Sequence, residues 1–312
     1  MGMRPGIRDV LWMAAGAAIL LLFVLLVLFF GRERGPDAQL AARAQRAELV
    51  GRMQLGLASA SEAEKSAVLA ITDPESQKFA DQARASTAEV ERERRELAEL
   101  LSRGGTQEER DLLAEFSRHF IEFQKIDDEL LDLAVKNSNL KAYVLTYGAA
   151  ADALDEMSAA LSRVVDANAG SRDAAKVTSL AFGAEVGALR IQTLLPPHIA
   201  EASDARMQEL EARMGKQDEQ VRSDLDALRA IPALHGDADL ELAASRYTRF
   251  REVKDQILAF SRENTNVRSL SISLDQKRKV MLVCHDVLGR LQEAIRKEPA
   301  PGATFGGRFG LE

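Results

Sequence analysis

The amino-acid sequence predicts an all-α protein, in which one N-terminal transmembrane helix is followed by two tandem antiparallel four-helix-bundle modules. Three observations support this fold class. A single long run near the N-terminus lacks charged residues, apolar residues elsewhere recur three and four positions apart, and no stretch alternates apolar and polar residues as a strand would. Only 5% of the 312 residues are aromatic, whereas Ala, Leu, Glu and Arg, which favour helices, are abundant.

The composition also excludes several classes of function. A single cysteine rules out a disulfide framework and any cysteine-based zinc or iron–sulfur site. The net charge of -7 argues against a nucleic-acid partner, because such partners are held by neutralising their phosphates. We therefore expect no cofactor, no bound metal and no nucleic acid.

The transmembrane prediction rests on residues 10–30, which contain no charged side chain. At about 1.5 Å per residue, this run spans the roughly 30 Å apolar core of a bilayer. A cleavable signal peptide is the alternative, but its apolar region is shorter, about 7–15 residues, and ends at a small-residue cleavage site. Residues 1–9 form an N-terminal stub, and arginines on both sides of the run orient it only weakly. No second run of spanning length follows, so we expect a single-pass protein.

Apolar stripes at helical spacing predict the helices that follow residue 38. Charged side chains fill the other faces, so each stripe needs partner helices to bury it, as in a bundle or a coiled coil. The consecutive acids Asp127, Asp128 and Glu129 spread around their helix and are expected on its solvated surface. The two clearest stripes are Phe79, Ala83, Val90, Leu97 and Leu101, and then Leu113, Phe116, Phe120, Phe123, Ile126, Leu130 and Leu133.

Local chemistry predicts where these helices begin and end. A hydroxyl or carboxylate side chain caps a helix start, proline suits the first turn, and glycine or a proline pair stops a helix. Thr106 with Glu109 forms a capping box, because each can bond the other's backbone N–H. The remaining signals are Thr72-Asp73-Pro74, Gly104-Gly105, a break at Pro196-Pro197, a cap at Ser203, and a separator at Pro232 with Gly236-Asp237.

The chain repeats itself at an offset of 127 residues. Residues 136–141 align with residues 263–268, so that two asparagines, the hydroxyl residue between them, an aliphatic residue and a cation all coincide. Because one helix stripe cannot be buried alone, each copy should close as a bundle. We infer a first helical-bundle module over residues 38–170, a second over 171–297, and a flexible tail over 298–312.

Several segments resemble the extracytoplasmic four-helix-bundle sensory module of methyl-accepting chemotaxis receptors. They are residues 64–70, 73–80 and 137–142 in the first copy, and residues 194–200 and 264–269 in the second. The resemblance implies a periplasmic domain held in the inner membrane, with a cytoplasmic N-terminus. It also implies a homodimer that binds a small ligand, with a small anion as the candidate, or a binding protein, and that passes a small helix displacement onward.

The sequence departs from a complete receptor of this family. It has no second membrane helix after the sensor, no coupling module and no long cytoplasmic coiled coil. We therefore expect it to act through a partner, such as a membrane receptor or kinase, or to be a stand-alone binding protein. A non-sensing helical scaffold or docking protein of the cell envelope is the alternative of a different class.

The two asparagine pairs are candidate ligand contacts. Asn137 and Asn264 fall on inward positions of their stripes, each followed two residues later by Asn139 or Asn266. Asparagine also caps helices and tolerates turn geometry, so the pairs could instead mark helix junctions. The third possibility is a polar layer inside the bundle, where buried amides need hydrogen-bond partners.

Three further side chains complete the candidate ligand-binding set. Arg190 lies among apolar residues and could grip a carboxylate through two hydrogen bonds, or lay its stem over those neighbours. Lys65 is its approximate counterpart in the first copy. His198, directly after two prolines, is included as a candidate ligand contact, and at such a corner its ring could cap a helix, bind a metal or titrate. No catalytic motif is present, so we expect no enzyme.

Overall fold

The computed structural model describes residues 36–298, and every element in this range is helical. The predicted transmembrane helix at 10–30, the stub at 1–9 and the tail beyond residue 298 lie outside the described residues. Between residues 36 and 298, none of the helices combines the length and apolarity needed to span a bilayer. The all-α prediction is confirmed for this range, which contains no strand.

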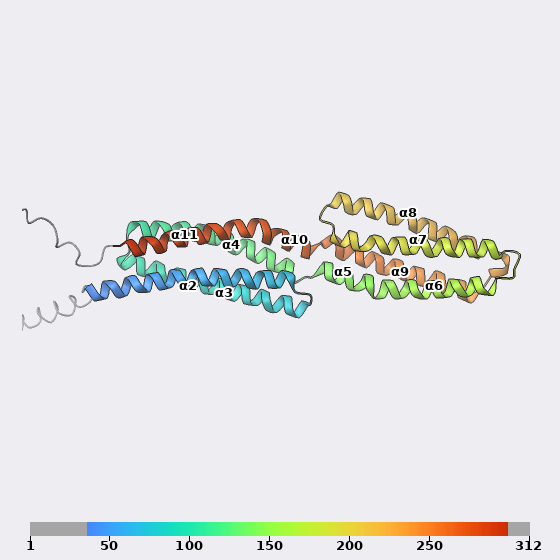
Figure 1. The fold of residues 1–312 in the computed structure, drawn as a ribbon, viewed down its shortest axis with the longest axis horizontal. Helices are drawn as coiled ribbons and strands as arrows, with labels where there is room; N and C mark the ends of the chain where they lie inside the picture. Colours follow the sequence, from blue (N-terminus) through green and yellow to red (C-terminus); the bar gives the residue numbers. More distant parts are fainter. Residues whose placement is uncertain (1–35, 299–312) are drawn as a thin grey trace, which may run out of the picture. The chain divides into compact units, whose positions relative to one another are not determined.

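Long helices joined by short turns make up the described chain (Figure 1). Two interruptions are helical themselves: a short 3-10 turn, η1, and a π-helical segment, η2. The elements are α2 (Pro36–Leu69), α3 (Asp73–Gly104), α4 (Gln107–Ala134), α5 (Ser138–Tyr147), α6 (Ala149–Ala167), α7 (Ala174–Ala200), α8 (Asp204–Arg229), η1 (Pro232–Leu234), α9 (Ala238–Glu263), α10 (Thr265–Ile272), η2 (Ser273–Lys277) and α11 (Arg278–Lys297).

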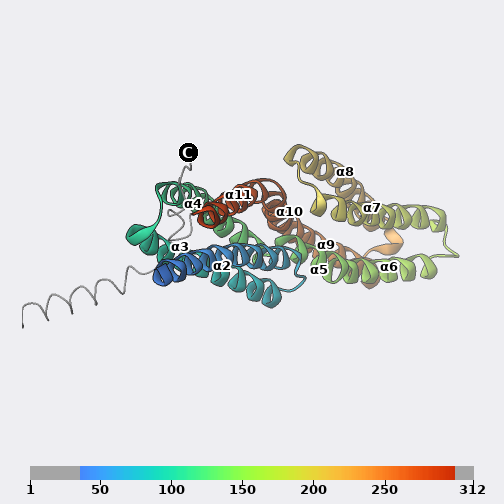
Figure 2. The same cartoon turned by 60° about the vertical axis from the view of Figure 1, so that its left-hand side comes forward.

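Two compact units divide the described chain. Unit 1 combines residues 36–59, 86–121 and 280–298, and unit 2 combines residues 60–85 and 122–279. Within unit 1, the segments of α2, α3, α4 and α11 lie side by side in both views (Figures 1 and 2). Within unit 2, α7 packs along α8 and α6 packs along α9.

These units do not follow the predicted limits 38–170 and 171–297. The predicted boundary falls in the turn between α6 and α7, and these two helices pack against each other inside unit 2. Helix α9 also packs against α5, α6 and α7. The bundle of unit 2 therefore draws on helices from both sides of residue 170.

Apolar side chains from each helix fill the cores, as the stripes predict. In unit 1, Phe116 and Phe120 stack with their ring centroids 5.3 Å apart. In unit 2, Tyr247 and Phe250 stack at 6.0 Å beside a long run of buried aliphatic residues. Alanines, leucines and valines make up most of both cores, and burial of such side chains is the main favourable term in folding.

Most predicted helix ends are confirmed. Thr106 and Glu109 form the predicted capping box, with each backbone N–H donating to the other's side-chain oxygen at 3.1 and 3.2 Å. Ser203 and Asp237 cap α8 and α9. The predicted break at Pro196-Pro197 is wrong, because α7 continues to Ala200. Buried His198 and Ile199 anchor this last turn, and their packing outweighs the backbone bonds that proline removes.

The repeat extends upstream at a second offset. Gly56 of α2 faces Val90 of α3, and Gly187 of α7 faces Val221 of α8. Gly187 and Val221 each lie 131 positions after Gly56 and Val90. At both glycines, an added Cβ would come within 2.6 Å of the facing valine methyl. Both helix pairs therefore approach closely at equivalent glycines.

Replacing Gly187 with alanine is expected to destabilise the protein by about 1–3 kcal/mol, because the new methyl forces α7 away from α8. Gly215 is the matched control, since it lies exposed in α8 with no atom near its Cβ position. Its replacement with alanine should stabilise the helix by about 1 kcal/mol. Denaturant unfolding of both variants checks this prediction. Equal changes of the same sign in their free energies of unfolding would contradict it.

Candidate functional site

Two asparagines with left-handed backbones form the centre of a helix junction in unit 2. Asn137 has φ of 49° and links α4 to α5, and Asn264 has φ of 52° and links α9 to α10. Asparagine tolerates this conformation better than most residues, which explains its presence at both places. Asn264 ends α9 and starts α10 directly, whereas Asn137 starts α5 after a short turn at residues 135–136 that follows α4.

The two junctions pair with each other through residues 127 positions apart. The backbone N–H of Ser138 donates to the hydroxyl of Thr265 at 3.1 Å, and the N–H of Thr265 donates back to the Ser138 hydroxyl at 3.0 Å. Asn139 and Asn266 repeat this exchange, each N–H donating to the other's side-chain carbonyl at 3.2 and 3.1 Å. The sequence repeat is therefore a local two-fold pairing, in which equivalent residues contact each other.

The side-chain amides of the junction donate hydrogen bonds to other parts of the chain. Asn139 Nδ2 donates to the carbonyl of Ile199 at 2.6 Å and to Asn264 Oδ1 at 2.8 Å. Asn264 Nδ2 donates to the Glu201 carbonyl, and Asn266 Nδ2 donates to Asn137 Oδ1. The structure thus brings the four predicted asparagines together as a junction that ties the end of α7 to α5 and α10. Their role as ligand contacts stays a prediction.

An exposed aspartate extends this junction towards α3. Asn137 Nδ2 donates to Asp73 Oδ1 at 3.0 Å, and Lys141 Nζ lies 3.1 Å from Asp73 Oδ2. The hydrogen bond from Asn137, followed by the interaction with Lys141, lowers the pKa of Asp73 below its ordinary value. Asp73 therefore remains ionised at neutral pH and holds the start of α3 to the junction.

His198 lies fully buried next to the junction, where both of its ring nitrogens are engaged. Nδ1 lies 2.7 Å from Ser261 Oγ, and Nε2 lies 2.8 Å from Glu211 Oε1. Ser261 donates its own proton to the carbonyl of His198, so its oxygen accepts from the ring. Arg262, followed by His198, lowers the pKa of Glu211. Serine, histidine and glutamate also form catalytic triads, but a buried serine that donates to the backbone is a structural group.

The other two predicted ligand residues lie apart from the junction. Arg190 is exposed on α7, and Lys65 is exposed on α2. Arg190 has the position of a surface arginine at the edge of a stripe. The junction therefore gathers the asparagines and neighbours His198, and it includes neither cation.

A buried charged layer lies elsewhere in unit 2, between α2, α4 and η2. Glu64, Asp127 and Lys277 are 0%, 1% and 1% exposed. Lys277 Nζ forms an ion pair with Asp127 Oδ1 and lies 4.0 Å from the centre of the Phe123 ring. A cation close to an aromatic face is favoured, and more so away from water. We call Glu64, Asp127, Ser273 and Lys277 the charged layer.

Glu64 is the least satisfied member of the charged layer. Within residues 36–298, no donor reaches either of its carboxylate oxygens with hydrogen-bonding geometry, although the Ser273 hydroxyl is a neighbour. Burial raises the pKa of Glu64 above its ordinary value, and the opposing effects of Ser273 and Lys277 do not cancel it. Glu64 therefore favours its protonated form to a higher pH than an exposed glutamate does.

The sequence pattern contained a signal for this layer that our prediction missed. Asp127 was expected on the surface, which is wrong, because it lies four residues after Phe123 and three before Leu130 on the same buried stripe. Lys277 likewise lies three residues before buried Val280. A charged residue on an apolar stripe at helical spacing is the signal that could have found both.

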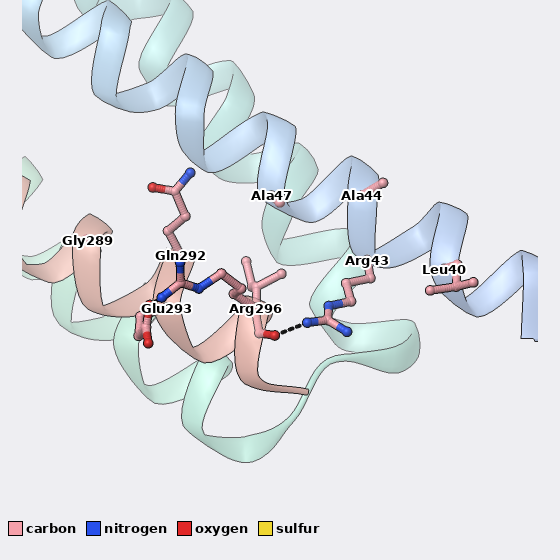
Figure 3. Close-up of a pocket in the computed structure, with 9 residues that line it drawn as sticks. Leu40, Arg43, Ala44, Ala47, Gly289, Gln292, Glu293 and Arg296 are labelled. Carbon is pink, nitrogen blue, oxygen red and sulfur yellow. Dashed lines mark hydrogen bonds and ion pairs between the residues drawn. The ribbon is translucent and has the colours of Figure 1, made fainter. Parts of the chain in front are cut away.

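A surface groove in unit 1 lies between the start of α2 and the end of α11 (Figure 3). Its volume is about 570 Å³, within the range of small-molecule sites. The Arg43 guanidinium donates to the carbonyl of Glu298 at 2.7 Å and to the carbonyl of Arg296. Arg43 thus binds backbone at the end of α11. The groove is lined by Leu40, Arg43, Ala44, Ala47, Gly289, Gln292, Glu293, Ile295 and Arg296.

A comparison with protein families bears on these features. Residues 56–178 match the family described as a four helix bundle sensory module for signal transduction. The predicted resemblance to the sensory module of chemotaxis receptors is confirmed over this range. The match ends at the start of α7, so the resemblance of the second copy stays a prediction. No curated protein matches the chain.

Proposed function

We propose that this chain is a membrane-anchored periplasmic sensory protein that binds a small anion in the groove between α2 and α11 and signals through a partner. The observation that carries the proposal is the position of Arg43. This arginine lines the groove and also holds the last carbonyls of α11. A ligand that binds Arg43 therefore acts directly on the final helix of the sensory bundle.

The lining of the groove matches a small organic acid. Arg43 and Arg296 provide guanidinium groups, which bind carboxylates through paired hydrogen bonds. Gln292 adds a neutral donor, and Leu40 and Ile295 offer apolar contact for a short carbon chain. Ala44, Ala47 and Gly289 leave space because their side chains are small. Glu293 forms an ion pair with Arg296. Because its carboxylate repels other negative charges, it disfavours ligands that carry more than one or two of them.

Competition for Arg43 supplies the mechanism. A carboxylate binds a guanidinium more strongly than a neutral carbonyl does. Ligand binding therefore releases the carbonyls of Arg296 and Glu298 from α2 and lets the end of α11 move. A ligand shifts a conformational equilibrium only through a difference in affinity between two states, and this exchange of partners at Arg43 provides that difference.

The remaining parts of the proposal come from the sequence and the family. The charge-free run at residues 10–30 is the inner-membrane anchor, with residues 1–9 in the cytoplasm. Sensory modules of this kind serve receptors, so we propose a homodimer and a receptor or kinase partner. We assign no catalytic activity to the protein.

Thermal unfolding of the full-length chain in detergent tests this function. We expect one or more monocarboxylic or dicarboxylic acids to raise the melting temperature, because a ligand that binds only the folded state stabilises it. At about 100 times its dissociation constant, the ligand should add roughly 2.7 kcal/mol. The Arg43→Gln variant should lose most of this shift while it keeps its fold, since Arg43 is only half-buried.

Arg190→Gln is the matched control, because Arg190 is exposed and lies outside the groove. It should retain the full ligand-induced shift. Loss of the shift in Arg190→Gln and not in Arg43→Gln would move the ligand site to α7. If no acid shifts the melting temperature and the chain instead recruits an envelope protein specifically, the scaffold alternative replaces the sensory function.

A further inference from the structure

The charged layer combines Glu64 and Asp127 from the first copy of the repeat with Ser273 and Lys277 from the second, and the equivalent positions can be compared with it. At the offset of 131, Glu64 corresponds to Leu195, and at the offset of 127, Lys277 corresponds to Ala150. Leu195 and Ala150 are fully buried. The positions equivalent to Glu64 and Lys277 are therefore apolar, which shows that the repeated fold does not require charges at these two positions.

Buried charges that a fold does not require lower its stability. Burying an ion pair costs several kcal/mol of desolvation per ion, and apolar replacements are often neutral or stabilising. Ser273 and Asp127 correspond to Thr146 and Lys254, so two of the four equivalent positions are apolar and a third carries a base in place of the acid. Retention of the layer at one of the two equivalent places indicates a role other than stability.

We propose that Glu64 is a proton-binding site, through which the external pH controls the packing of η2 and thereby of α11. The layer contains two carboxylates, Glu64 and Asp127, and one ammonium, Lys277. With both carboxylates ionised, it carries one uncompensated negative charge away from water. A single proton on Glu64 makes the layer neutral and leaves the ion pair of Asp127 and Lys277 intact.

The groups that act on Glu64 come from three elements. Asp127 reaches it from α4, Ser273 and Lys277 reach it from η2, and Lys65 is its exposed neighbour on α2. From α3, the neighbouring buried cluster receives the apolar residues Ala80 and Ala83. The balance between the two acids and Lys277 therefore determines the charge of the layer.

The position of the layer on a π-helix links it to the last helix. Lys277 and Ser273 are the ends of η2, which runs directly into α11. Single π-helical turns inside α-helices often mark functional sites. Gly148 interrupts the first copy between α5 and α6, 127 residues before Asp275 of η2. Both copies thus have an irregular turn at the same place, and only the turn of the second copy, η2, contains charged residues.

The sign of the pH effect follows from the direction of the shift. Burial raises the pKa of Glu64 in the folded state, so the folded state binds a proton more tightly than the unfolded state does. The contribution of Glu64 to the stability of the fold is therefore fully present below the pKa of about 4.3 that glutamate has in the unfolded chain. It decreases as the pH rises through the pKa of Glu64 in the folded state. At higher pH, the ionised layer weakens the packing of η2.

The test compares the full-length chain with its Glu64→Gln variant, which keeps the shape of the side chain and cannot ionise. The variant should melt at nearly the same temperature as the parent near pH 4.5. Near pH 8 it should melt higher by about 3 °C or more, because it carries no buried charge at this position. Glu62→Gln is the control, since Glu62 is exposed on the same helix, and it should leave the pH dependence unchanged.

Hydrogen exchange reports on η2 itself. After correction for intrinsic rates, protection of the amides of residues 273–277 should fall several-fold between about pH 5 and pH 8 in the parent, and not in Glu64→Gln. Parallel melting curves for parent and variant at all pH values would overturn proton binding at Glu64. A difference in melting with unchanged protection of η2 would overturn the control of η2 packing by Glu64, and with it the proposed route to α11.

Discussion

Replacement of Lys277 with methionine is expected to destabilise the protein by about 3–5 kcal/mol at neutral pH. Methionine fills a similar volume but removes the partner of Asp127 and the cation near the Phe123 ring. Two acids, Glu64 and Asp127, then stay buried after the positive charge of Lys277 is lost. Loss of one partner of a buried pair costs far more than loss of the whole pair, because the remaining charge stays out of water. Denaturant unfolding near pH 7 measures this loss.

A double variant separates loss of the pair from loss of packing. Asp127→Asn combined with Lys277→Met should recover most of the stability that Lys277→Met loses, because it removes both members of the ion pair. Lys279→Met is the control, since the Lys279 side chain is 73% exposed and pairs with Asp275 one turn away. Its free energy of unfolding should differ from that of the parent by less than about 0.5 kcal/mol. Equal losses in Lys277→Met and Lys279→Met would show that the buried pair contributes nothing.

The sequence predicts the helices well because their signals are local. The capping box of Thr106 and Glu109 depends on residues three positions apart, and both of its bonds form as expected. Apolar stripes similarly identify buried residues such as Phe116 and Phe120. Pro196 and Pro197 show the limit of such signals, because contacts of His198 with distant Ser261 keep α7 helical beyond them.

The division into units is not a local property. The repeat at 127 is correctly found in the sequence, but consecutive copies were expected to form consecutive modules. A repeat shows which residues are equivalent and does not show which helices they contact. The structure pairs Ser138 with Thr265 and α6 with α9, so the bundle of unit 2 uses helices from both copies. Which helices contact one another over such sequence distances can be predicted only by comparing complete arrangements of the helices.

The candidate sites show a similar limit. The asparagine pairs were found because Asn137 and Asn264 fall on inward stripe positions, and the structure buries both. Whether an inward amide meets a ligand or another part of the chain depends on partners more than 120 residues away, such as Asn139 with Asn264. The groove at Arg43 was missed because its backbone partners lie at the other end of the chain.

Replacement of Asn139 with aspartate is expected to destabilise the protein by about 3 kcal/mol at neutral pH. The side chain keeps its size but loses both donated bonds, to the Ile199 carbonyl and to Asn264 Oδ1. An ionised oxygen would then face two acceptor oxygens at 2.6 and 2.8 Å. Oδ1 would still accept from the Asn266 N–H, but the second oxygen would face only acceptors, and a buried charge that is incompletely hydrogen-bonded carries a large desolvation cost. Thermal and denaturant unfolding measure the loss.

The pH dependence of this variant distinguishes charge repulsion from a simple loss of bonds. The folded state disfavours ionisation of the new carboxyl at position 139, so its pKa rises above the unfolded value of about 3.9. The penalty is therefore smallest below that value, where the acid can donate one bond, and it grows as the pH rises. Asn168→Asp is the control, because the Asn168 side chain donates to the Val164 carbonyl at the half-buried end of α6. Its smaller loss should change little with pH, and a pH-independent loss at position 139 would show that repulsion is not the cause.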